Sequence, residues 1–400
     1  MSGLQGRNIV LGVTGSIAAY KAVQLASTLA HRGANVHSVL TAAARGFVSP
    51  LNFQALTRQA VHTDVGEVDR EGRIAHVELG RAADLMIVAP ATANTIARLA
   101  MGLADDIVSA TWLTTAAPCL VAPAMESSMY LAESTQANLR TLADRGVGII
   151  APGTGRLASG HSGVGRLADV EAVIDRIGAT LGQGGDLEGK KIVITAGGTR
   201  EAIDPVRFIG NPSSGRQGIA LARAARDRGA GVTLIVGAIA VEPPTGMKVI
   251  EATSAAAMKT AVEQATAGCD ALVMAAAVGD FTPVVVAEQK IKKSGGPLSL
   301  DLQQTDDILA GLSGGFVKIG FAAETENLLE NARAKLESKA LDAIVANDVA
   351  ASGLGFGSAM NRVKIVRGDG QVTEAGPAPK QAIAEKVIDV VVELLGGSQQ

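Results

Sequence analysis

Residues 190–218, which read KKIVITAGGTREAIDPVRFIGNPSSGRQG, decide the fold of the second half of this 400-residue chain. The run of β-branched residues predicts a buried strand over Lys191 to Ala196. The stretch ends at the start of a helix, directly after Ser213, Ser214 and Gly215. A strand that leads through a glycine-rich loop into a helix is the opening unit of an α/β domain.

The loop between these two elements is rich in groups that bind anions. Thr195 to Thr199 offer main-chain N–H groups and hydroxyls, Asn211 offers an amide, and Arg200, Arg207 and Arg216 offer positive charge. Glycine allows several N–H groups to turn toward one point, and a helix N-terminus favours phosphate. A glycine-rich turn with surface arginines is the plain alternative, but the combination favours a phosphate or nucleotide site.

Composition sets the class of fold. Apolar residues make up 47% of the chain and aromatic residues only 2%, so the cores must consist of Ala, Val, Ile and Leu. Such cores suit parallel sheets that are buried on both faces. A chain of this length predicts two domains. We therefore expect an α/β protein with two doubly wound domains and mainly parallel sheets.

Charge and targeting signals exclude several classes of protein. The net charge of −3 gives no bulk attraction to nucleic acid or to a membrane surface. No apolar run approaches the roughly 20 residues needed to cross a bilayer, and the N-terminus lacks the layout of a signal peptide. Cys119 and Cys269 lie far apart, without metal spacing or a disulfide framework. We expect a cytoplasmic protein with no nucleic-acid or membrane partner.

The first domain, residues 1–182, opens with a second strand–turn–helix unit. A strand over Arg7 to Val13 leads into Thr14, Gly15 and Ser16, with Ser16 as the expected N-cap of a helix over Ile17 to Arg32. This places the turn at the carboxyl edge of the sheet, where open α/β folds bind ligands. The turn lacks the GxGxxG pattern of dinucleotide sites, and this absence favours the phosphate of a mononucleotide. An ordinary turn without a ligand is the alternative. The polar, glycine-rich residues 183–189 read as a linker to residues 190–400.

At this point the chain resembles a known family. Residues 195–218 resemble the signature loop of phosphopantothenate–cysteine ligase. From about Arg7 to Leu395, the chain is similar to the bacterial bifunctional protein that joins this ligase to phosphopantothenoylcysteine decarboxylase. The resemblance implies two steps of coenzyme A biosynthesis. It also implies a flavodoxin-like flavoprotein domain, followed by a Rossmann-like ligase domain.

The resemblance assigns FMN to the first domain. GVTGSIAAYK at 12–21 and APATANTIARLAMGLADD at 89–106 are similar to FMN-binding elements. They imply FMN contacts from the residues at the strand ends, which are Thr14, Gly15, Ser16, Thr41, Thr92 and Asn94. His76 falls where the family keeps its active-site histidine, although a single histidine is more often structural. The implied assembly is a trimer with flavin at the subunit interfaces.

Two motifs depart from the family. The family's substrate motif Pro-Ala-Met-Asn is replaced here by Pro-Ala-Met-Glu at Pro123 to Glu126. The resemblance implies that Met125 and Glu126 contact the substrate. A glutamate at this position repels a substrate carboxylate unless the glutamate is protonated. The flap motif Leu-Ala-Cys-Gly has Ser159 in place of the cysteine that donates a proton. Serine is a poor acid near neutral pH. We hypothesise that His161 takes this role; a plain flap residue is the alternative, as is a weak or lost decarboxylase step.

The resemblance assigns the nucleotide site to the second domain. AAAVGDF at 275–281 is similar to a nucleotide segment in which the family has Ala at the position of Gly279. Lys290 follows in a run of basic residues, for which an exposed, solvated surface is the alternative interpretation. The resemblance implies that Lys290 helps to form an acyl-cytidylate intermediate. Asp280 is the expected Mg²⁺ ligand. The residues expected to contact CTP are Met274, Ala275, Ala276, Asp280, Asp306, Asp307, Ile308, Leu309, Phe321, Lys335 and Lys339; the family has Pro at the position of Asp306.

The implied ligase joins 4′-phosphopantothenate to cysteine. Asn211 would donate to the reacting carbonyl oxygen, Arg207 would hold substrate or intermediate, and Ser213, Ser214 and Gly215 would bind the phosphate arm. The resemblance further implies ligase dimers and, with flavin-domain trimers, a dodecamer. The expectation that the nucleotide is CTP rather than ATP rests on the resemblance alone. A non-catalytic flavin-binding regulator is a rival reading, against which the intact ligase residues argue.

Overall fold

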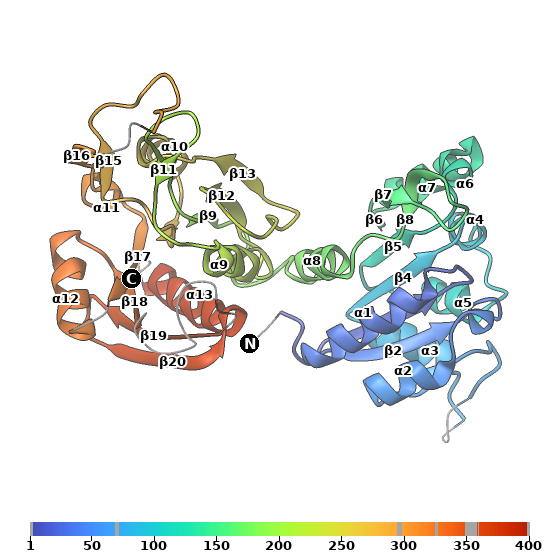
Figure 1. Ribbon diagram of the computed structural model, residues 1–400. Coiled ribbons are helices and arrows are strands. Elements are labelled where there is room, and N and C mark those ends of the chain that lie inside the picture. The colour runs from blue at the N-terminus through green and yellow to red at the C-terminus, as the bar shows by residue number, and fades with distance from the viewer. Residues whose placement is uncertain are drawn as a thin grey trace. The chain divides into compact units, whose positions relative to one another are not determined.

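The computed structural model describes residues 3–68, 72–293, 298–324, 327–348, 358 and 360–397. The chain divides into two compact units, one reaching Leu181 and the other starting at Gly182. Each unit is built on a mainly parallel sheet that is flanked by helices (Figure 1). The predicted α/β class with mainly parallel sheets is therefore confirmed.

The first unit has a six-stranded parallel sheet in the order β3-β2-β1-β4-β5-β6. Its strands are β1 (Asn8–Val13), β2 (Asn35–Leu40), β3 (Val61–His62), β4 (Leu85–Ala91), β5 (Cys119–Pro123) and β6 (Gly148–Ile149). Without the two-residue edge strand β3, the order is that of flavodoxin-like folds. The order reverses between β1 and β4, so the carboxyl ends of these two strands border the crevice where such sheets bind ligands.

Helices cover both faces of this sheet. One face packs against α1 (Ala19–His31), α2 (Pro50–Thr57) and α8 (Val170–Leu181). The other packs against α3 (Ala75–Ala82), α4 (Ala93–Met101), α5 (Ile107–Thr114) and α7 (Glu133–Asp144). The short helices η1 (Ala44–Gly46) and α6 (Ser127–Leu131) and the hairpin of β7 (Gly153–Arg156) and β8 (Ser162–Arg166) complete the unit.

The second unit has an eight-stranded sheet in the order β13-β12-β9-β14-β17-β18-β19-β20. Its parallel strands are β9 (Lys191–Ala196), β12 (Gly231–Val236), β13 (Lys248–Glu251), β14 (Ala271–Met274), β17 (Val317–Glu324) and β18 (Ala343–Asp348). Two antiparallel strands follow, β19 (Met360–Arg367) and β20 (Val372–Pro379). Here the order reverses between β9 and β14.

The helices of the second unit again lie on two faces. α9 (Arg216–Arg226) and α13 (Lys380–Gly397) pack on one face, and α10 (Ala255–Thr266), α11 (Ile308–Gly311) and α12 (Leu328–Ser338) pack on the other. Residues 182–189 form turns that join this unit, since Leu187 is buried in its core. Among the helices that the structure describes, none is long and apolar enough to cross a membrane.

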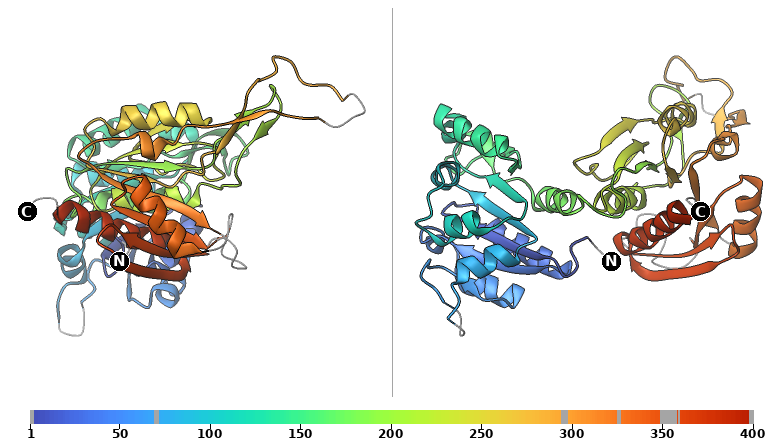
Figure 2. Two further views of the ribbon diagram at one scale, coloured as in Figure 1. Left: turned by 90° about the vertical axis from the view of Figure 1, so that its left-hand side faces the viewer. Right: turned by 180° about the vertical axis from the view of Figure 1, so that it is seen from behind.

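Two small hairpins project side by side from the second unit and form an arm (Figure 2). One pairs β10 (Glu201–Ala202) with β11 (Phe208–Ile209), and the other pairs β15 (Phe281–Pro283) with β16 (Leu302–Gln304). The N–H of Ala287 donates to the carbonyl of Ile203 at 3.0 Å, which links the two hairpins. We call the described residues from 200 to 210 and from 281 to 304 the arm. Its short strands carry too little periodicity to be predicted from the sequence.

A threonine at the end of the first strand links the two walls of each crevice. In the first unit, Thr14 Oγ1 donates to the Pro90 carbonyl at 2.6 Å and accepts from the Thr92 N–H at 3.1 Å. In the second unit, Thr195 Oγ1 accepts from the Ala276 N–H at 3.0 Å. These hydroxyls, which the sequence suggested for ligands, are therefore engaged inside the fold.

The start of α1 also differs from the expectation. The helix begins at Ala19, with Ala18 at its N-cap position, rather than at Ile17. Ser16 is not the N-cap; its Oγ accepts from the Ala18 N–H at 3.3 Å. The turn is therefore longer than predicted, and Ser16 lies within it.

We predict that Thr14→Val destabilises the first unit by about 1–3 kcal/mol, because a valine of the same shape leaves the Pro90 carbonyl and the Thr92 N–H without their partner. Thr28→Val is the control, since the Thr28 hydroxyl only donates to the Gln24 carbonyl on exposed helix surface. Urea unfolding of both variants measures the difference. Equal stabilities would contradict the structural role of the Thr14 hydroxyl.

Candidate functional sites

The predicted cofactor residues of the first unit lie at one edge of its sheet. The turn Thr14 to Ser16 follows β1, Thr41 follows β2, and Thr92 and Asn94 follow β4. All these strands are parallel, so their carboxyl ends meet at the same edge. Met125 and Glu126, which follow β5, lie at this edge as well.

This edge fits a phosphate-bearing group. A Cβ on Gly15 would lie 2.5 Å from the Ala43 Cβ, so the turn approaches the segment after β2 as only glycine can. Thr92 caps α4 by accepting from the Thr95 N–H at 3.3 Å, and Asn94 is exposed in the first turn of this helix. The first N–H groups of a helix lack partners within it and favour an anion.

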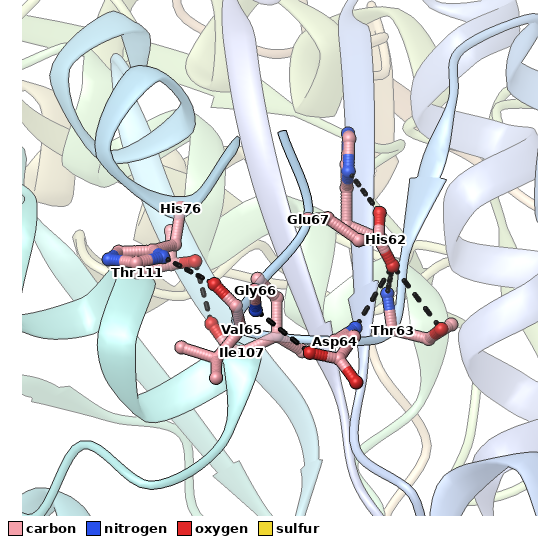
Figure 3. Close-up of polar contacts among 9 residues, drawn as sticks. All are labelled: His62, Thr63, Asp64, Val65, Gly66, Glu67, His76, Ile107 and Thr111. Carbon is pink, nitrogen blue, oxygen red and sulfur yellow. Dashed lines mark hydrogen bonds and ion pairs between the residues drawn. The ribbon is translucent and has the colours of Figure 1, made fainter. Parts of the chain in front are cut away.

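His76 is the second residue of α3 and is half-buried. Its Nδ1 lies 3.2 Å from the carbonyl oxygen of Val65 (Figure 3). Its own carbonyl oxygen lies 2.9 Å from Thr114 Oγ1 on α5. The imidazole and the main chain of His76 are therefore held by different elements.

The structure brings the two altered motifs of the first unit together. The N–H of Met125 donates to the Gly165 carbonyl at 3.0 Å, and Ser127 Oγ donates to the Val164 carbonyl. The β7–β8 hairpin is thereby fixed on the segment that carries Glu126. Ser159 and His161 lie exposed between the two strands of this hairpin.

In the second unit, a cleft of about 580 Å³ opens beside the end of β14. It gathers the start of α9, the loop after β14, the start of α11 and one side of α12. The sequence-predicted residues that line it are Asn211, Ser213, Ser214, Gly215, Met274, Ala275, Ala276, Asp280, Asp306, Asp307, Ile308, Leu309, Phe321, Lys335 and Lys339.

Ion pairs already neutralise two carboxylates of the cleft. Asp307 pairs with Lys339 at 2.9 Å, and Asp306 pairs with Lys259 at 2.7 Å. Burial raises the pKa of Asp307, but Lys339 and the Ala310 N–H lower it more, so the net shift is downward. Among the described residues, no three metal-ligating side chains cluster. The exposed Asp280 therefore fits Mg²⁺ only as a single protein ligand beside substrate phosphates.

Arg207 and Lys290 are outside the lining of the cleft and belong to the arm. Arg207 Nε donates to Asp204 at 2.9 Å, and its Nη2 donates to the Ile291 carbonyl. The Ile291 N–H donates to the same Asp204 carboxylate at 3.1 Å. In this structure, Arg207 thus anchors the segment that carries Lys290.

Comparison with known proteins decides the family. Residues 2–182 match the model of the flavoprotein family, and residues 187–395 match that of the DNA/pantothenate metabolism flavoprotein C-terminal domain. The coenzyme A biosynthesis bifunctional protein CoaBC of Bacillus subtilis (strain 168) is 43% identical over 397 residues, which cover 98% of each chain. The chain belongs to the family of coenzyme A biosynthesis bifunctional proteins.

Two further relatives are similar. The coenzyme A biosynthesis bifunctional protein CoaBC of Escherichia coli (strain K12) is 43% identical over 375 residues, or 92% of each chain. A crystal structure of the C-terminal domain of the same kind of protein is 37% identical, with a TM-score of 0.46 over 53% of this chain and 98% of that one.

Neither cysteine of this family member can replace the flap cysteine. Cys119 opens β5, at the opposite end of that strand from Met125, and burial raises the pKa of its thiol to about 12. Cys269 lies in the other unit, where burial raises its pKa to about 11. Cys119 therefore does not take the position of the cysteine that the flap motif lacks.

The cleft also contains residues that sequence reasoning missed. Asn361 is buried and donates to Gln217, which in turn donates to the Lys380 carbonyl. These three residues, together with Asn347, line the cleft. They come from α9, β18, β19 and α13, and no motif joins them. The one available signal was an asparagine at the start of β19, a strand that mixes polar and apolar residues, and it does not mark a site by itself.

We predict that Asp204→Asn destabilises the second unit and that its effect shrinks at low pH. Burial raises the pKa of Asp204, but N–H groups of Val206, Ile291 and Arg207 lower it from 3.8 to about 2. Because the folded pKa is depressed, the stabilisation is complete well above the unfolded pKa and is lost as pH falls toward the folded one.

Urea unfolding at pH 7 and pH 3 tests this, with Asp301→Asn on the exposed part of the arm as control. The difference between wild type and Asp204→Asn should be smaller at pH 3. If wild type and Asp204→Asn differ in unfolding free energy by the same amount at pH 7 and pH 3, the charge of Asp204 contributes nothing to stability.

Proposed function

We propose that the chain joins 4′-phosphopantothenate to cysteine with CTP, and then decarboxylates the product to 4′-phosphopantetheine. The observation that carries this proposal is the second-unit cleft, in which the loop at 195–218 and the predicted nucleotide residues meet. Bifunctional relatives that match nearly the whole chain support it.

The ligase reaction must first activate a carboxylate. A carboxylate oxygen of 4′-phosphopantothenate attacks the α-phosphorus of CTP, and pyrophosphate leaves. The amine of cysteine then attacks the acyl carbon, CMP leaves, and an amide forms. Lys335, Lys339 and Phe321 line the side of the cleft assigned to CTP. The α9 N-terminus at Ser213 to Gly215 is assigned to the substrate phosphate.

The charges that develop in these steps assign the remaining roles. Negative charge grows on phosphate oxygens in the first step, which suits Lys290 and an Mg²⁺ ion held by Asp280 and the nucleotide. It grows on the carbonyl oxygen in the second step. Asn211 faces the cleft and donates one N–H to the Val278 carbonyl at 3.1 Å, so its second N–H remains for that oxygen.

The ligase assignment predicts that Lys290→Gln lowers the rate of pyrophosphate release by about a hundredfold to a thousandfold, because one fixed positive charge is lost from the transition state. Lys293→Gln, in the same basic run, should keep the rate. Decarboxylation of supplied 4′-phosphopantothenoylcysteine should stay unchanged in both variants. An equal loss in the two variants would show only a general effect of positive charge.

For the decarboxylase reaction, we assign FMN to the edge formed by Thr14 to Ser16, Thr41, Thr92 and Asn94. Bound FMN would supply the oxidation of the substrate thiol, which creates a C=S group that accepts the electrons left by CO₂, and the reduced flavin would return the two electrons to the protonated enethiol to give 4′-phosphopantetheine. We assign to His76 the movement of a substrate proton. We assign Met125 and Glu126, on the segment that is hydrogen-bonded to the hairpin, to the substrate carboxyl end, where Glu126 must be protonated or turned away.

The hairpin tip gives the test of the proton donor. His161→Ala should slow decarboxylation of supplied 4′-phosphopantothenoylcysteine by about a hundredfold if His161 is the general acid. Ser159→Cys should restore turnover in that background, because a thiol is the far stronger acid. Product formation followed by mass spectrometry measures both. Unchanged turnover in both variants would place the donor elsewhere.

Ser159 and Glu126 also favour a second candidate function, an active ligase whose first unit binds flavin but decarboxylates weakly and serves assembly. Exposed apolar residues support self-association of that unit: Tyr20 is 62% exposed and Leu51 is 67% exposed, on the adjoining helices α1 and α2. We propose flavin-domain trimers and ligase-domain dimers, combined in a dodecamer in the cytoplasm.

A further inference from the structure

The segment of residues 62–68 connects β3 to the region before α3, and one carboxylate organises it. Glu67 Oε1 accepts from the N–H groups of Thr63 at 2.8 Å and Asp64 at 3.0 Å. Glu67 Oε2 lies 2.8 Å from His62 Nδ1 (Figure 3). An ionised carboxylate only accepts hydrogen bonds, so His62 Nδ1 carries the proton and donates it.

The main chain of Glu67 joins the same segment to α3. Its carbonyl accepts from the N–H of Ala75, the first residue of α3, at 3.0 Å. Val68 and Ile74 form an isolated antiparallel bridge beside this contact. Glu67 therefore connects β3, through its side chain, with the helix that carries His76, through its main chain.

Val65 lies inside this segment and contacts the imidazole of His76. A carbonyl oxygen only accepts, so the 3.2 Å contact with the Val65 carbonyl requires the proton on His76 Nδ1. In the neutral ring this leaves Nε2 with a free lone pair, and Figure 3 shows Nε2 on the side of the ring away from Val65. The tautomer thus follows from the shape of the segment.

We propose that Glu67 is a positioning residue for decarboxylation: its carboxylate shapes residues 62–68 so that the Val65 carbonyl holds His76 in its Nδ1–H tautomer. Nε2 is then ready to accept a proton from the substrate and to return it. The proposal rests on the proposed role of His76 and extends it to a residue that does not touch the substrate.

The charges around Glu67 are consistent with this role. Burial raises the pKa of Glu67, but the Thr63 N–H, His62 and the Asp64 N–H lower it more, so the carboxylate is ionised near neutral pH. Burial and the nearby His62 lower the pKa of His37, which keeps that imidazole neutral under the same conditions. His62, rather than His37, is thus the histidine that hydrogen-bonds to the Glu67 carboxylate.

The test compares Glu67→Ala and Glu67→Gln with Glu78→Gln, in full-length protein loaded with flavin. Glu78 is a matched control because it lies on α3, two residues from His76, and only approaches Arg81 at 3.9 Å. Solid-state ¹⁵N NMR of histidine-labelled protein reads the tautomer of His76. The chain has five histidines, and the loss of a signal in His76→Asn assigns it.

We expect His76 to be an Nδ1–H tautomer in wild type and Glu78→Gln, and a mixture of tautomers in Glu67→Ala. The kcat for supplied 4′-phosphopantothenoylcysteine should fall about tenfold to a hundredfold in Glu67→Ala, with KM and flavin content unchanged. Glu67→Gln retains one acceptor oxygen, so its kcat should lie between those of wild type and Glu67→Ala. This variant also serves if Glu67→Ala does not fold.

An Nδ1–H tautomer that persists in both Glu67 variants would overturn the proposal, and so would an Nε2–H tautomer in wild type. These spectra need no turnover. If wild type does not decarboxylate the supplied substrate, the proposed function of the first unit fails, while the positioning by Glu67 is still decided by the spectra.

Discussion

The hydrogen bonds that threonine hydroxyls make across the point where strand order reverses are the contacts on which both sites depend. At such a point, the loops that follow two neighbouring strands lead to helices on opposite faces of the sheet. Thr14 links the ends of β1 and β4, and Thr195 links the end of β9 to the loop after β14. The Thr199 hydroxyl accepts from the Gly279 N–H at 2.8 Å and extends the second link toward Asp280. The walls of each crevice are thus fixed before any ligand binds.

Rigid edges and projecting segments have different tasks in this protein. Groups assigned to hold phosphate lie at strand ends and helix starts, where parallel strands and glycine turns define their positions. Two of the groups assigned to proton transfer or charge stabilisation lie on projecting segments, His161 on a hairpin and Lys290 on the arm. Each such segment is tied down by polar contacts near its base, through Ser127 under the hairpin and through Asp204 and Arg207 in the arm.

The long apolar strands and the glycine turns were predictable because burial on both faces leaves a continuous Val, Ile and Leu signal. The strand over Lys191 to Ala196 has the predicted bounds. The sequence could not show that Ser16 misses the N-cap position, since that depends on how the turn packs against Ala43. It also could not show that Arg207 anchors the arm through Asp204, or that Asn361 reaches the cleft, because these contacts join residues far apart in the chain. Residues that belong to a motif could be proposed for a site from the sequence, and residues that only tertiary packing brings to the cleft could not.

The most direct test of the account is product analysis of the purified protein supplied with 4′-phosphopantothenate, cysteine, Mg²⁺ and CTP, with ATP in parallel. Mass spectrometry separates the substrate from both products. The account predicts 4′-phosphopantetheine, which requires both units to work in one chain. Accumulation of 4′-phosphopantothenoylcysteine alone would contradict the decarboxylase half, and the absence of both products with either nucleotide would contradict the account as a whole.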